Sequence, residues 1–361
     1  MRTYLDHNAT SPLRPSVAEA MRAAMELSGN ASSVHREGRV ARKLLDDSRE
    51  AIAREIGAIA PMISFTSGGS EANNLAIKSA PVERILVSAI EHPAVIEAAK
   101  ASGKPMAFIP ATAQGVADLE ALRTLLEGPK VLISVMLANN ETGVIQPIRE
   151  IVALAQKHQA LVHTDAVQAF GKIPVNFGLL GVDMMTIAAH KVGGPAGVGA
   201  LVVRDGLALE PLVHGGGQEL RRRAGTENLI GIAGFAAVAR EKHIDTNSLR
   251  DELETQLSEA VIFGKDAARL SNTTCFACAG MSAETLLMNF DLEGVAVSSG
   301  SACSSGKVAR SHVLEAMQAP HELSRGAIRV SLGWNTTYEN INHFIAVWRR
   351  LLARHKAKAA A

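Results

Sequence analysis

Short apolar runs alternate with segments of helical periodicity between about residues 60 and 205. The alternation predicts strands at 63–65, 85–89, 106–109, 131–137, 161–164, 184–188 and 200–203, with helices at 71–79, 93–101, 119–127 and 148–158. Strands separated by helices of this length indicate βαβ units and a mostly parallel sheet covered on both faces. In such a fold we expect a ligand at the carboxyl ends of the strands.

The pattern changes after residue 205 and restarts near residue 249. Residues 206–235 are rich in Gly and Arg, and the apolar segment 229–242 predicts the start of a long helix that links two domains. Beyond it we expect a helix from 249, strand-like segments around 273–278, a helix at 283–290, a glycine–serine loop, a C-terminal helix from 338 and a frayed tail at 356–361. This second pattern is typical of a smaller α+β domain.

The composition is that of a globular chain of 361 residues, which is long enough for two domains. A formal net charge of +1 argues against nucleic acid or an anionic membrane surface as the main partner. No apolar run approaches the ~20 residues that span a bilayer, and the first residues do not resemble a signal peptide. Three cysteines argue against a disulfide framework, so we expect a cytoplasmic protein.

Three motifs at predicted strand ends carry candidate chemistry. The turn at 66–71 (TSGGSE) can offer backbone N–H groups and Ser70 to a phosphate, although an N-capping turn has the same pattern. Asp165, in HTDAVQ, either caps a helix or needs a cationic or hydrogen-bonding partner. Lys191, in HKVGGP, is either a solvated surface lysine or a Schiff-base nucleophile. Together they match the amine, the ring-nitrogen partner and the anion cradle that hold pyridoxal 5'-phosphate (PLP).

The chain resembles the class V aminotransferases, which are fold-type I PLP enzymes, and among them the cysteine desulfurases of the NifS/IscS type. About ten motifs in the expected order carry the resemblance, at 4–10 (YLDHNAT), 29–35 (GNASSVH), 65–74, 91–92, 139–143 (NNETG), 165–168, 190–191, 214–219 (HGGGQE), 224–226 (AGT), 298–303 (SSGSAC) and 328–333 (IRVSLG). The resemblance implies an α/β fold with a large PLP-binding domain at 13–248 and a small α+β domain formed by 1–12 and 249–361.

The same resemblance assigns roles around the cofactor. Lys191 would form the covalent link to PLP and later move the substrate Cα proton, and Asp165 would pair with the ring nitrogen. His92 would stack on the ring and assist proton transfers. The other cofactor contacts that it implies are to the phosphate, from Gly69, Ser70, His190 and, across a homodimer interface, Thr226, and to the phenolic oxygen, from Asn140 and Gln168.

The resemblance also implies how substrate and sulfur are handled. Arg329 would bind the carboxylate of L-cysteine, with Asn140 beside it. Cys303 lies in a segment too small and polar to pack as core, so we expect an exposed thiol on a mobile loop rather than an inert one. Its thiolate would attack the substrate sulfur, leaving a persulfide on Cys303 and releasing alanine. An iron-sulfur scaffold or another acceptor protein would then take the sulfur, in a nitrogenase-dedicated or a housekeeping role.

The pair Cys275 and Cys278 has the spacing of a metal or redox site. In a strand, however, positions i and i+3 point to opposite faces. Neither a second such pair nor spaced histidines completes a zinc set. We therefore expect packing residues here and no metal site.

One position departs from the family pattern. Relatives usually carry a phosphate-binding serine two residues before the histidine of the His190–Lys191 pair, and here that residue is Ala188. Thr186 shares its strand face but lies about 6–7 Å further back, too far to substitute. The missing hydroxyl predicts weaker cofactor retention rather than lost activity.

Other functions remain open at this point. The scaffold could serve transamination or selenocysteine cleavage, or it could belong to a non-catalytic sulfur-trafficking protein. A dinucleotide-dependent enzyme is disfavoured because the chain has no G-x-G-x-x-G followed by an acid.

Overall fold

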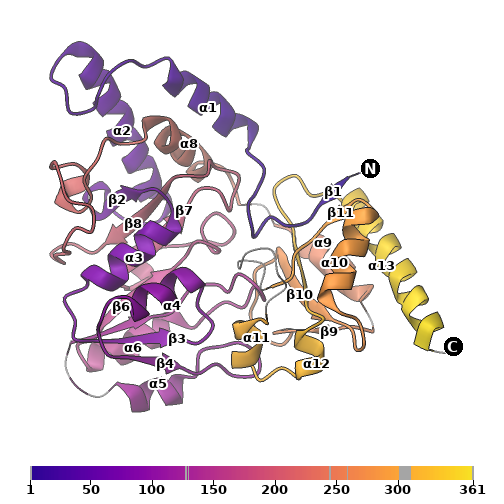
Figure 1. Cartoon of the computed structure of the whole chain (residues 1–361). Helices are drawn as coiled ribbons and strands as arrows, with labels where there is room; N and C mark the ends of the chain where they lie inside the picture. The colour runs from indigo at the N-terminus through magenta and orange to yellow at the C-terminus, as the bar shows by residue number, and fades with distance from the viewer. Residues whose placement is uncertain are drawn as a thin grey trace.

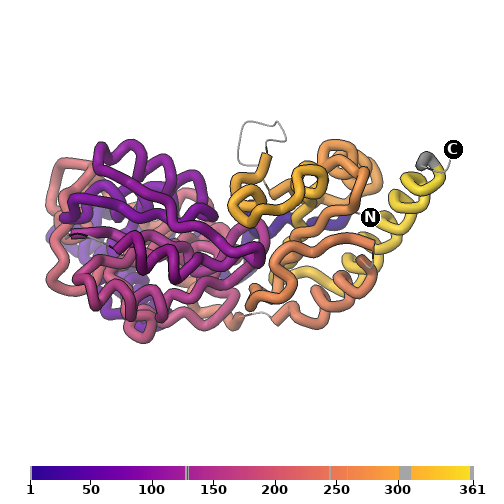
Figure 2. The backbone as a smooth tube through the Cα atoms, turned by 90° about the horizontal axis from the view of Figure 1, so that it is seen from below, coloured from indigo at the N-terminus to yellow at the C-terminus, as the bar shows by residue number. Residues whose placement is uncertain are grey.

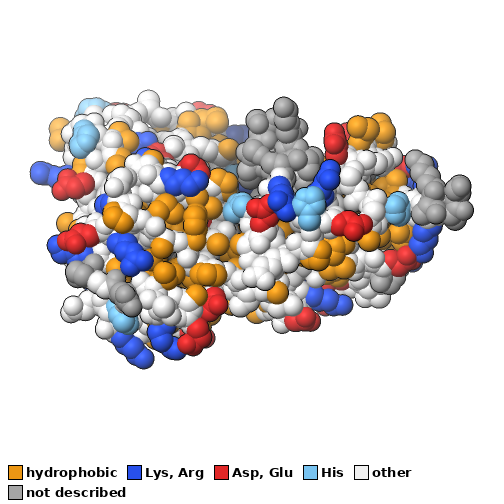
Figure 3. All heavy atoms as spheres, turned by 60° about the horizontal axis from the view of Figure 1, so that its bottom comes forward, with side chains coloured by type: hydrophobic (Ala, Val, Ile, Leu, Met, Phe, Trp, Pro, Cys, Tyr) orange, Lys and Arg blue, Asp and Glu red, His pale blue; other side chains and the backbone are white. Residues whose placement is uncertain are grey.

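The protein is described by a computed structural model that covers residues 2–359 apart from 127, 129, 244, 258 and 301–309. It folds into a large lobe and a small lobe that lie side by side (Figure 1). The N-terminal segment crosses between them, so that both ends of the chain lie in the small lobe (Figure 2). On the face drawn in Figure 3, charges of both signs are interspersed over both lobes, in keeping with the net charge of +1.

A seven-stranded sheet forms the centre of the large lobe. Its order is β2-β8-β7-β6-β5-β3-β4, and only β8 runs antiparallel to its neighbours. The strands are β2 (Ile63–Thr66), β3 (Arg84–Ser88), β4 (Met106–Ile109), β5 (Val131–Ser134), β6 (Leu161–Asp165), β7 (Met184–Ala188) and β8 (Gly199–Val203). The mostly parallel sheet predicted from the sequence is therefore confirmed.

Helices cover both faces of this sheet. Along β3, Ile85 and Val87 pack into one apolar cluster while Leu86 packs into another, because successive side chains of a strand point to opposite faces. The cluster with Ile85 contains α3 (Gly69–Ser79) and α4 (Pro93–Lys100). The cluster with Leu86 contains α1 (Pro15–Met25), α2 (Arg36–Glu55), α5 (Leu119–Leu125), α6 (Ile148–Lys157), α7 (Phe177–Leu180) and α8 (Leu229–Ala239).

The small lobe has a core of its own. Strand β10 (Thr273–Ala277) lies antiparallel between β9 (Val261–Ile262) and β12 (Ile328–Ser331), and β1 (Thr3–Tyr4) pairs in parallel with β11 (Val295–Ala296). Its helices are α9 (Asn247–Thr255), α10 (Ala283–Leu292), α11 (His312–Ala316), α12 (His321–Ser324) and α13 (Tyr338–Ala359). Helix α13 buries Ile341, Phe344, Ile345, Trp348 and Leu351, which recur at helical spacing along one face.

Several details differ from the sequence-based expectations. Helix α8 ends at Ala239 and packs on α1 and α2 in the large lobe, because nearly all of its side chains are apolar and buried, so it does not link two domains. Helix α13 continues to Ala359 through the tail predicted to fray, where Lys356 pairs with Glu259 at 2.6 Å. Strand β5 ends at Ser134 rather than 137. The two helices that precede residue 60, α1 and α2, were not predicted.

Cys275 and Cys278 are buried on opposite sides of the small-lobe sheet. Cys275 packs with Phe263 and Val313, whereas Cys278 packs in the cluster that contains Phe276 and Trp348. Both pack as core residues, as predicted. Burial raises the pKa of each thiol above its ordinary value, which makes a reactive thiolate unfavourable at either position.

The N-terminal residues belong to the packing of the small lobe. Leu5 is fully buried in its core cluster, while Val17 is fully buried in the core of the large lobe. The precise boundaries at 12/13 and 248/249 stay predictions. In the part of the chain that the structure describes, no helix has both the length and the apolar character needed to cross a bilayer.

Leu5→Ala tests the anchoring of the N-terminal segment. We expect it to lower the free energy of unfolding by about 2–5 kcal/mol, because it leaves a cavity in the small-lobe core. The measurement is urea unfolding followed by tryptophan fluorescence, with Leu292→Ala as control, since Leu292 is 79% exposed in the same lobe. Equal costs for the two variants would contradict the packing described here.

Candidate active site

A cavity of about 410 Å³ lies where the two lobes meet, at the carboxyl ends of β5, β6 and β7. The large lobe lines most of it. Ser298, Gly300 and Arg329 line it from the small lobe, and the N-terminal segment adds Asp6, Asn8 and Ala9. The cavity brings together nine of the residues singled out from the sequence: Gly69, Ser70, His92, Asn140, Asp165, Gln168, His190, Lys191 and Arg329.

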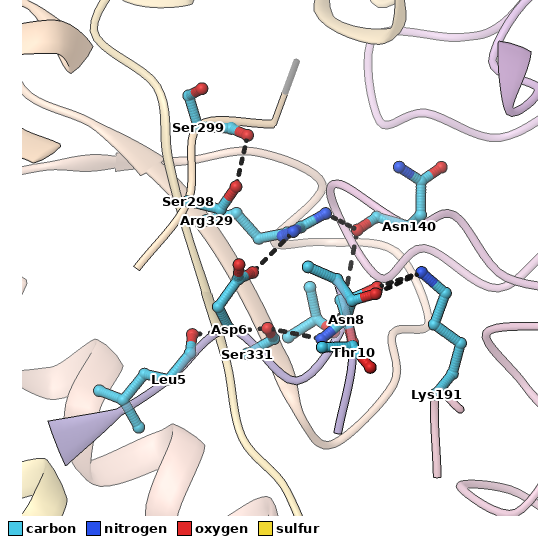
Figure 4. Close-up of polar contacts among 12 residues, drawn as sticks. Leu5, Asp6, Asn8, Thr10, Asn140, Lys191, Ser298, Ser299, Arg329 and Ser331 are labelled. Carbon is cyan, nitrogen blue, oxygen red and sulfur yellow. Dashed lines mark hydrogen bonds and ion pairs between the residues drawn. The ribbon is translucent and has the colours of Figure 1, made fainter. Parts of the chain in front are cut away.

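Lys191 follows the last residue of β7 by three positions and reaches towards the N-terminal segment. Its Nζ donates hydrogen bonds to the backbone carbonyl oxygens of Asn8, at 2.9 Å, and Ala9, at 2.8 Å (Figure 4). The amine is therefore fixed at the cavity wall by a segment more than 180 residues away in sequence. A lysine held at a defined point in a cavity can act as a nucleophile or a base.

Asp165 is the last residue of β6, the strand next to β7 in the sheet. Only 6% exposed, it accepts hydrogen bonds at Oδ2 from Asn73 Nδ2, at 2.7 Å, and at Oδ1 from the backbone N–H of Val167, at 2.9 Å. These donors stabilise a buried carboxylate, which then presents negative charge to the cavity.

The N-terminus of α3 forms the part of the cavity suited to an anion. Gly68 precedes the helix with φ of +153°, a conformation that favours glycine, and makes no side-chain cap. A Cβ added to Gly69 would lie 2.9 Å from Val167 Cγ2, so the close packing of α3 on the loop after β6 requires glycine. Gly69 and Ser70 therefore bring the N–H end of the helix to the cavity.

Thr186 cannot replace the serine that Ala188 lacks. Its Oγ1 is hydrogen-bonded to His163 Nε2 at 3.1 Å, and only its methyl group faces Gly69. The other ring nitrogen of His163 contacts Ser134 Oγ at 2.9 Å. The hydroxyl on this strand is thus engaged inside the sheet, which supports the expectation drawn from the spacing alone.

His92 caps α4 from the edge of the cavity. Its Nδ1 accepts a hydrogen bond from the backbone N–H of Ala94 at 3.1 Å, so the neutral ring carries its proton on Nε2. Burial lowers the pKa of His92, and the nearby positive charges of Lys191 and Arg329 lower it further. Together they outweigh the negative charge of Asp165, which raises the pKa. His190, also in the cavity wall, has its pKa lowered to about 4 by burial and by the positive charges of Lys191 and Lys172.

Arg329 projects from β12 with its guanidinium already oriented. Nη2 donates to Asp6 Oδ1 at 2.8 Å, and Nη1 donates to the backbone carbonyl of Asn140 at 3.0 Å (Figure 4). Among the described residues, neither Nε of Arg329 nor the side-chain Oδ1 of Asn140 has a hydrogen-bond partner, although both atoms are buried. Buried polar atoms without partners in a cavity wall indicate a ligand that supplies them.

One predicted site residue lies away from this cavity. Thr226 lines a separate cavity of about 100 Å³ with Glu219 and Arg223. Cys303 lies outside the described residues. The roles assigned to both therefore stay predictions.

Several residues of the site were missed in the sequence. Asp6 orients Arg329, Asn73 holds Asp165, and Asn8 bonds Lys191. All three stood in quoted motifs, yet a motif alone does not show which group a residue contacts.

Glu141 was also missed. It contacts Gly300 and Ser311, which lie on either side of residues 301–309 in the sequence. Its Oε2 accepts a hydrogen bond from Ser311 Oγ at 2.6 Å, and a Cβ on Gly300 would lie only 2.2 Å from the same atom. Burial raises the pKa of this carboxyl. The motif NNETG supplied the only signal for Glu141 in the sequence.

The aminotransferase class-V family model matches residues 3–344 of the chain. The chain belongs to the class V aminotransferase family. It is 43% identical to the cysteine desulfurase IscS of Dictyoglomus turgidum, over 97% of this chain and 94% of that protein, and 41% identical to a cysteine desulfurase of Cereibacter sphaeroides, over 96% and 94%. These similarities place it among the cysteine desulfurases of the NifS/IscS type, as the motifs predicted.

Solved structures agree with this family assignment. A NifS-like protein from Rickettsia africae superposes with a TM-score of 0.91 at 36% identity, covering 98% of this chain and 100% of that one. The structure "SspA in complex with cysteine" superposes with a TM-score of 0.82 at 32% identity, covering 91% and 98%. The α/β fold of a NifS-like enzyme is therefore confirmed.

The buried His163 makes the stability of this desulfurase depend on pH. Burial lowers its pKa to about 3, so the folded ring stays neutral while the unfolded chain takes up a proton below about 6.5. The free energy of unfolding should therefore fall as the pH drops from about 6.5 towards 3.

Urea unfolding midpoints measured across this pH range give the slope. His163→Asn should flatten it, whereas His158→Asn, at the exposed end of α6, should leave it unchanged. A slope unaltered by His163→Asn would contradict the neutral buried ring.

Proposed function

We propose that this cysteine desulfurase binds PLP in the cavity between its lobes and moves the sulfur of L-cysteine to Cys303. The observation that carries the proposal is the placement of Lys191 and Asp165 after neighbouring strands, with the N-terminus of α3 at the same sheet edge. An amine, a buried carboxylate and an anion cradle around one cavity match the three polar ends of PLP.

The residues present fit this cofactor. Lys191 would hold it covalently and Asp165 would keep its ring nitrogen protonated, while Gly69, Ser70 and His190 would bind its phosphate. The unpartnered buried Oδ1 of Asn140 is a feature that a ligand in this cavity explains. When bound, PLP supplies an electron-accepting ring to the substrate carbon. Every other step falls to side chains of this chain.

Arg329 would bind the carboxylate of L-cysteine. Asp6 and the carbonyl of Asn140 fix its guanidinium, so little side-chain entropy is lost when the substrate arrives. His92, with its proton on Nε2, lines the same cavity and can donate a hydrogen bond there, and we expect it to assist proton transfers. Lys191 would move the substrate Cα proton.

Cys303 would then receive the sulfur. Its thiolate attacks the sulfur of the bound cysteine, the new S–S bond forms as the substrate C–S bond breaks, and protonation of the remaining three-carbon fragment yields alanine. The persulfide on Cys303 passes its outer sulfur to the thiol of an acceptor, for which an iron-sulfur scaffold protein is our expectation. Thr226 would complete the phosphate site of a second subunit in a homodimer.

Cys303→Ala tests the sulfur step. We expect alanine formation from L-cysteine to fall by more than a hundredfold, while the absorbance change of the bound cofactor on adding cysteine persists, because substrate binding does not need this thiol. Alanine is quantified together with sulfide, and mass spectrometry locates the extra sulfur on the protein.

Cys278→Ser is the matched control, because it removes one of the two buried cysteines of the small lobe. It should keep both the activity and the persulfide. Sulfide and alanine production that survives Cys303→Ala would contradict the proposal. Preferential release of selenium or transfer of an amino group would point to another reaction of this family.

Ala188→Ser tests the departure from the family pattern. The added hydroxyl faces the cavity beside Gly69, where one hydrogen bond to a charged phosphate contributes about 1.5–3 kcal/mol. We expect PLP to dissociate roughly ten- to a hundredfold more slowly, as followed by absorbance during dilution into a PLP trap. Ala138→Ser, which adds a hydroxyl elsewhere in the cavity, should leave this rate unchanged. An equal rate for wild type and Ala188→Ser would refute the expectation.

A further inference from the structure

Two lysine amines bind the same buried asparagine. Asn8 is 1% exposed, and its backbone carbonyl oxygen accepts a hydrogen bond from Lys191 Nζ at 2.9 Å. Its side-chain Oδ1 accepts another from Lys172 Nζ at 2.8 Å. The proposed function uses Lys191 and leaves Lys172 without a role, although burying a lysine amine is costly and calls for an explanation.

Lys172 has only neutral partners in the described contacts. Besides Asn8, its Nζ donates to Gln168 Oε1 at 2.6 Å, and no carboxylate pairs with it among the ion pairs of the described residues. Burial holds the pKa of Lys172 well below its ordinary value, and the positive charges of Lys191 and Arg329 lower it further. Charged or neutral, the amine donates to both amide oxygens.

These contacts decide which way the Gln168 amide faces. Its Oε1 lies against the Lys172 amine, and its Nε2 donates to the backbone oxygen of Asn8 at 3.0 Å. A flipped amide would set NH₂ against the donating amine and oxygen against the Asn8 carbonyl, which are two repulsive contacts. Gln168 lines the cavity and keeps a second N–H on Nε2, so it offers the cavity a donor and not an acceptor.

We propose that Lys172 is a positioning residue that locks Gln168 as a hydrogen-bond donor towards the phenolic oxygen of bound PLP, beside the Lys191 amine. The inference rests on the proposed cofactor site and assigns Lys172 no contact with substrate. A donor fixed in this orientation stabilises the anionic form of the phenolic oxygen. It therefore favours the unprotonated form of the bound cofactor, whose absorbance differs from that of the protonated form.

The test measures the absorbance of the bound cofactor as a function of pH and takes the midpoint of its change. Replacing a residue with only a structural role would leave this midpoint unchanged. Lys172→Met frees the Gln168 amide to turn, and losing one hydrogen bond to a charged group should move the midpoint up by about one pH unit. Lys172→Arg keeps the donors and should restore the wild-type midpoint. Lys172→Leu, which likewise has no hydrogen-bond donor, replaces the Met variant in the comparison where that variant does not fold.

The positive charge of Lys172 also lowers the pKa of His7 and of His190, so Lys172→Met changes both groups, whereas Lys172→Arg keeps the charge and Gln168→Leu leaves it in place. The charged and titratable groups around the network are Lys191, Arg329, His7, His190 and Arg14, and the cavity that Gln168 lines adds Asp6, His92 and Asp165. Lys104→Met is the matched control: Lys104 is a half-buried lysine that donates to the carbonyl oxygens of Ala80 and Lys78, away from the cavity. It should leave the midpoint unchanged.

A double-mutant comparison shows whether Lys172 acts through Gln168. Gln168→Leu should raise the midpoint by itself, and adding Lys172→Met should then change it little. Equal midpoints for wild type and Lys172→Met, or full additivity of the two shifts, would overturn the inference. A wild-type protein that takes up no PLP would instead overturn the proposed function, so the two failures are distinguishable.

Discussion

One buried asparagine connects the parts of the molecule on which the site depends. Asn8 accepts hydrogen bonds from Lys191, Gln168 and Lys172 of the large lobe and from Asn272. It donates through Nδ2 to Thr273 Oγ1 and the Asn140 carbonyl, and through its backbone N–H to Ser331 Oγ. A buried residue whose donors and acceptors are satisfied from both lobes tolerates few alternative arrangements, because each broken contact leaves a polar group unpaired.

This constraint explains how a cavity between two separate cores can hold a defined geometry. The large lobe supplies Lys191 and Asp165 from strand ends, and the small lobe supplies Arg329 from β12. The N-terminal segment joins them: Asp6 fixes the guanidinium of Arg329, and the Asn8 and Ala9 carbonyls fix the amine of Lys191. In the proposed function, the orientation of a substrate carboxylate relative to the reactive amine would therefore depend on a few residues near the start of the chain.

The sequence predicted the parts of the site that local pattern specifies. Apolar runs that end in a charged residue located Asp165 and Lys191 at the edge of a parallel sheet, and family motifs added Arg329 and His92. It did not reveal Lys172 or Glu141, because their roles come from contacts with Asn8 and Ser311, more than 160 residues away. Likewise, α8 was expected to link domains, since an all-apolar helix has no periodicity that shows which core will bury it.

The most direct test of the account is to reduce the PLP-loaded protein with borohydride and map the modified peptide by mass spectrometry. We expect a single pyridoxyl adduct on Lys191, the amine that the Asn8 and Ala9 carbonyls hold at the cavity wall. An adduct on the neighbouring Lys172, or no adduct at all, would contradict it.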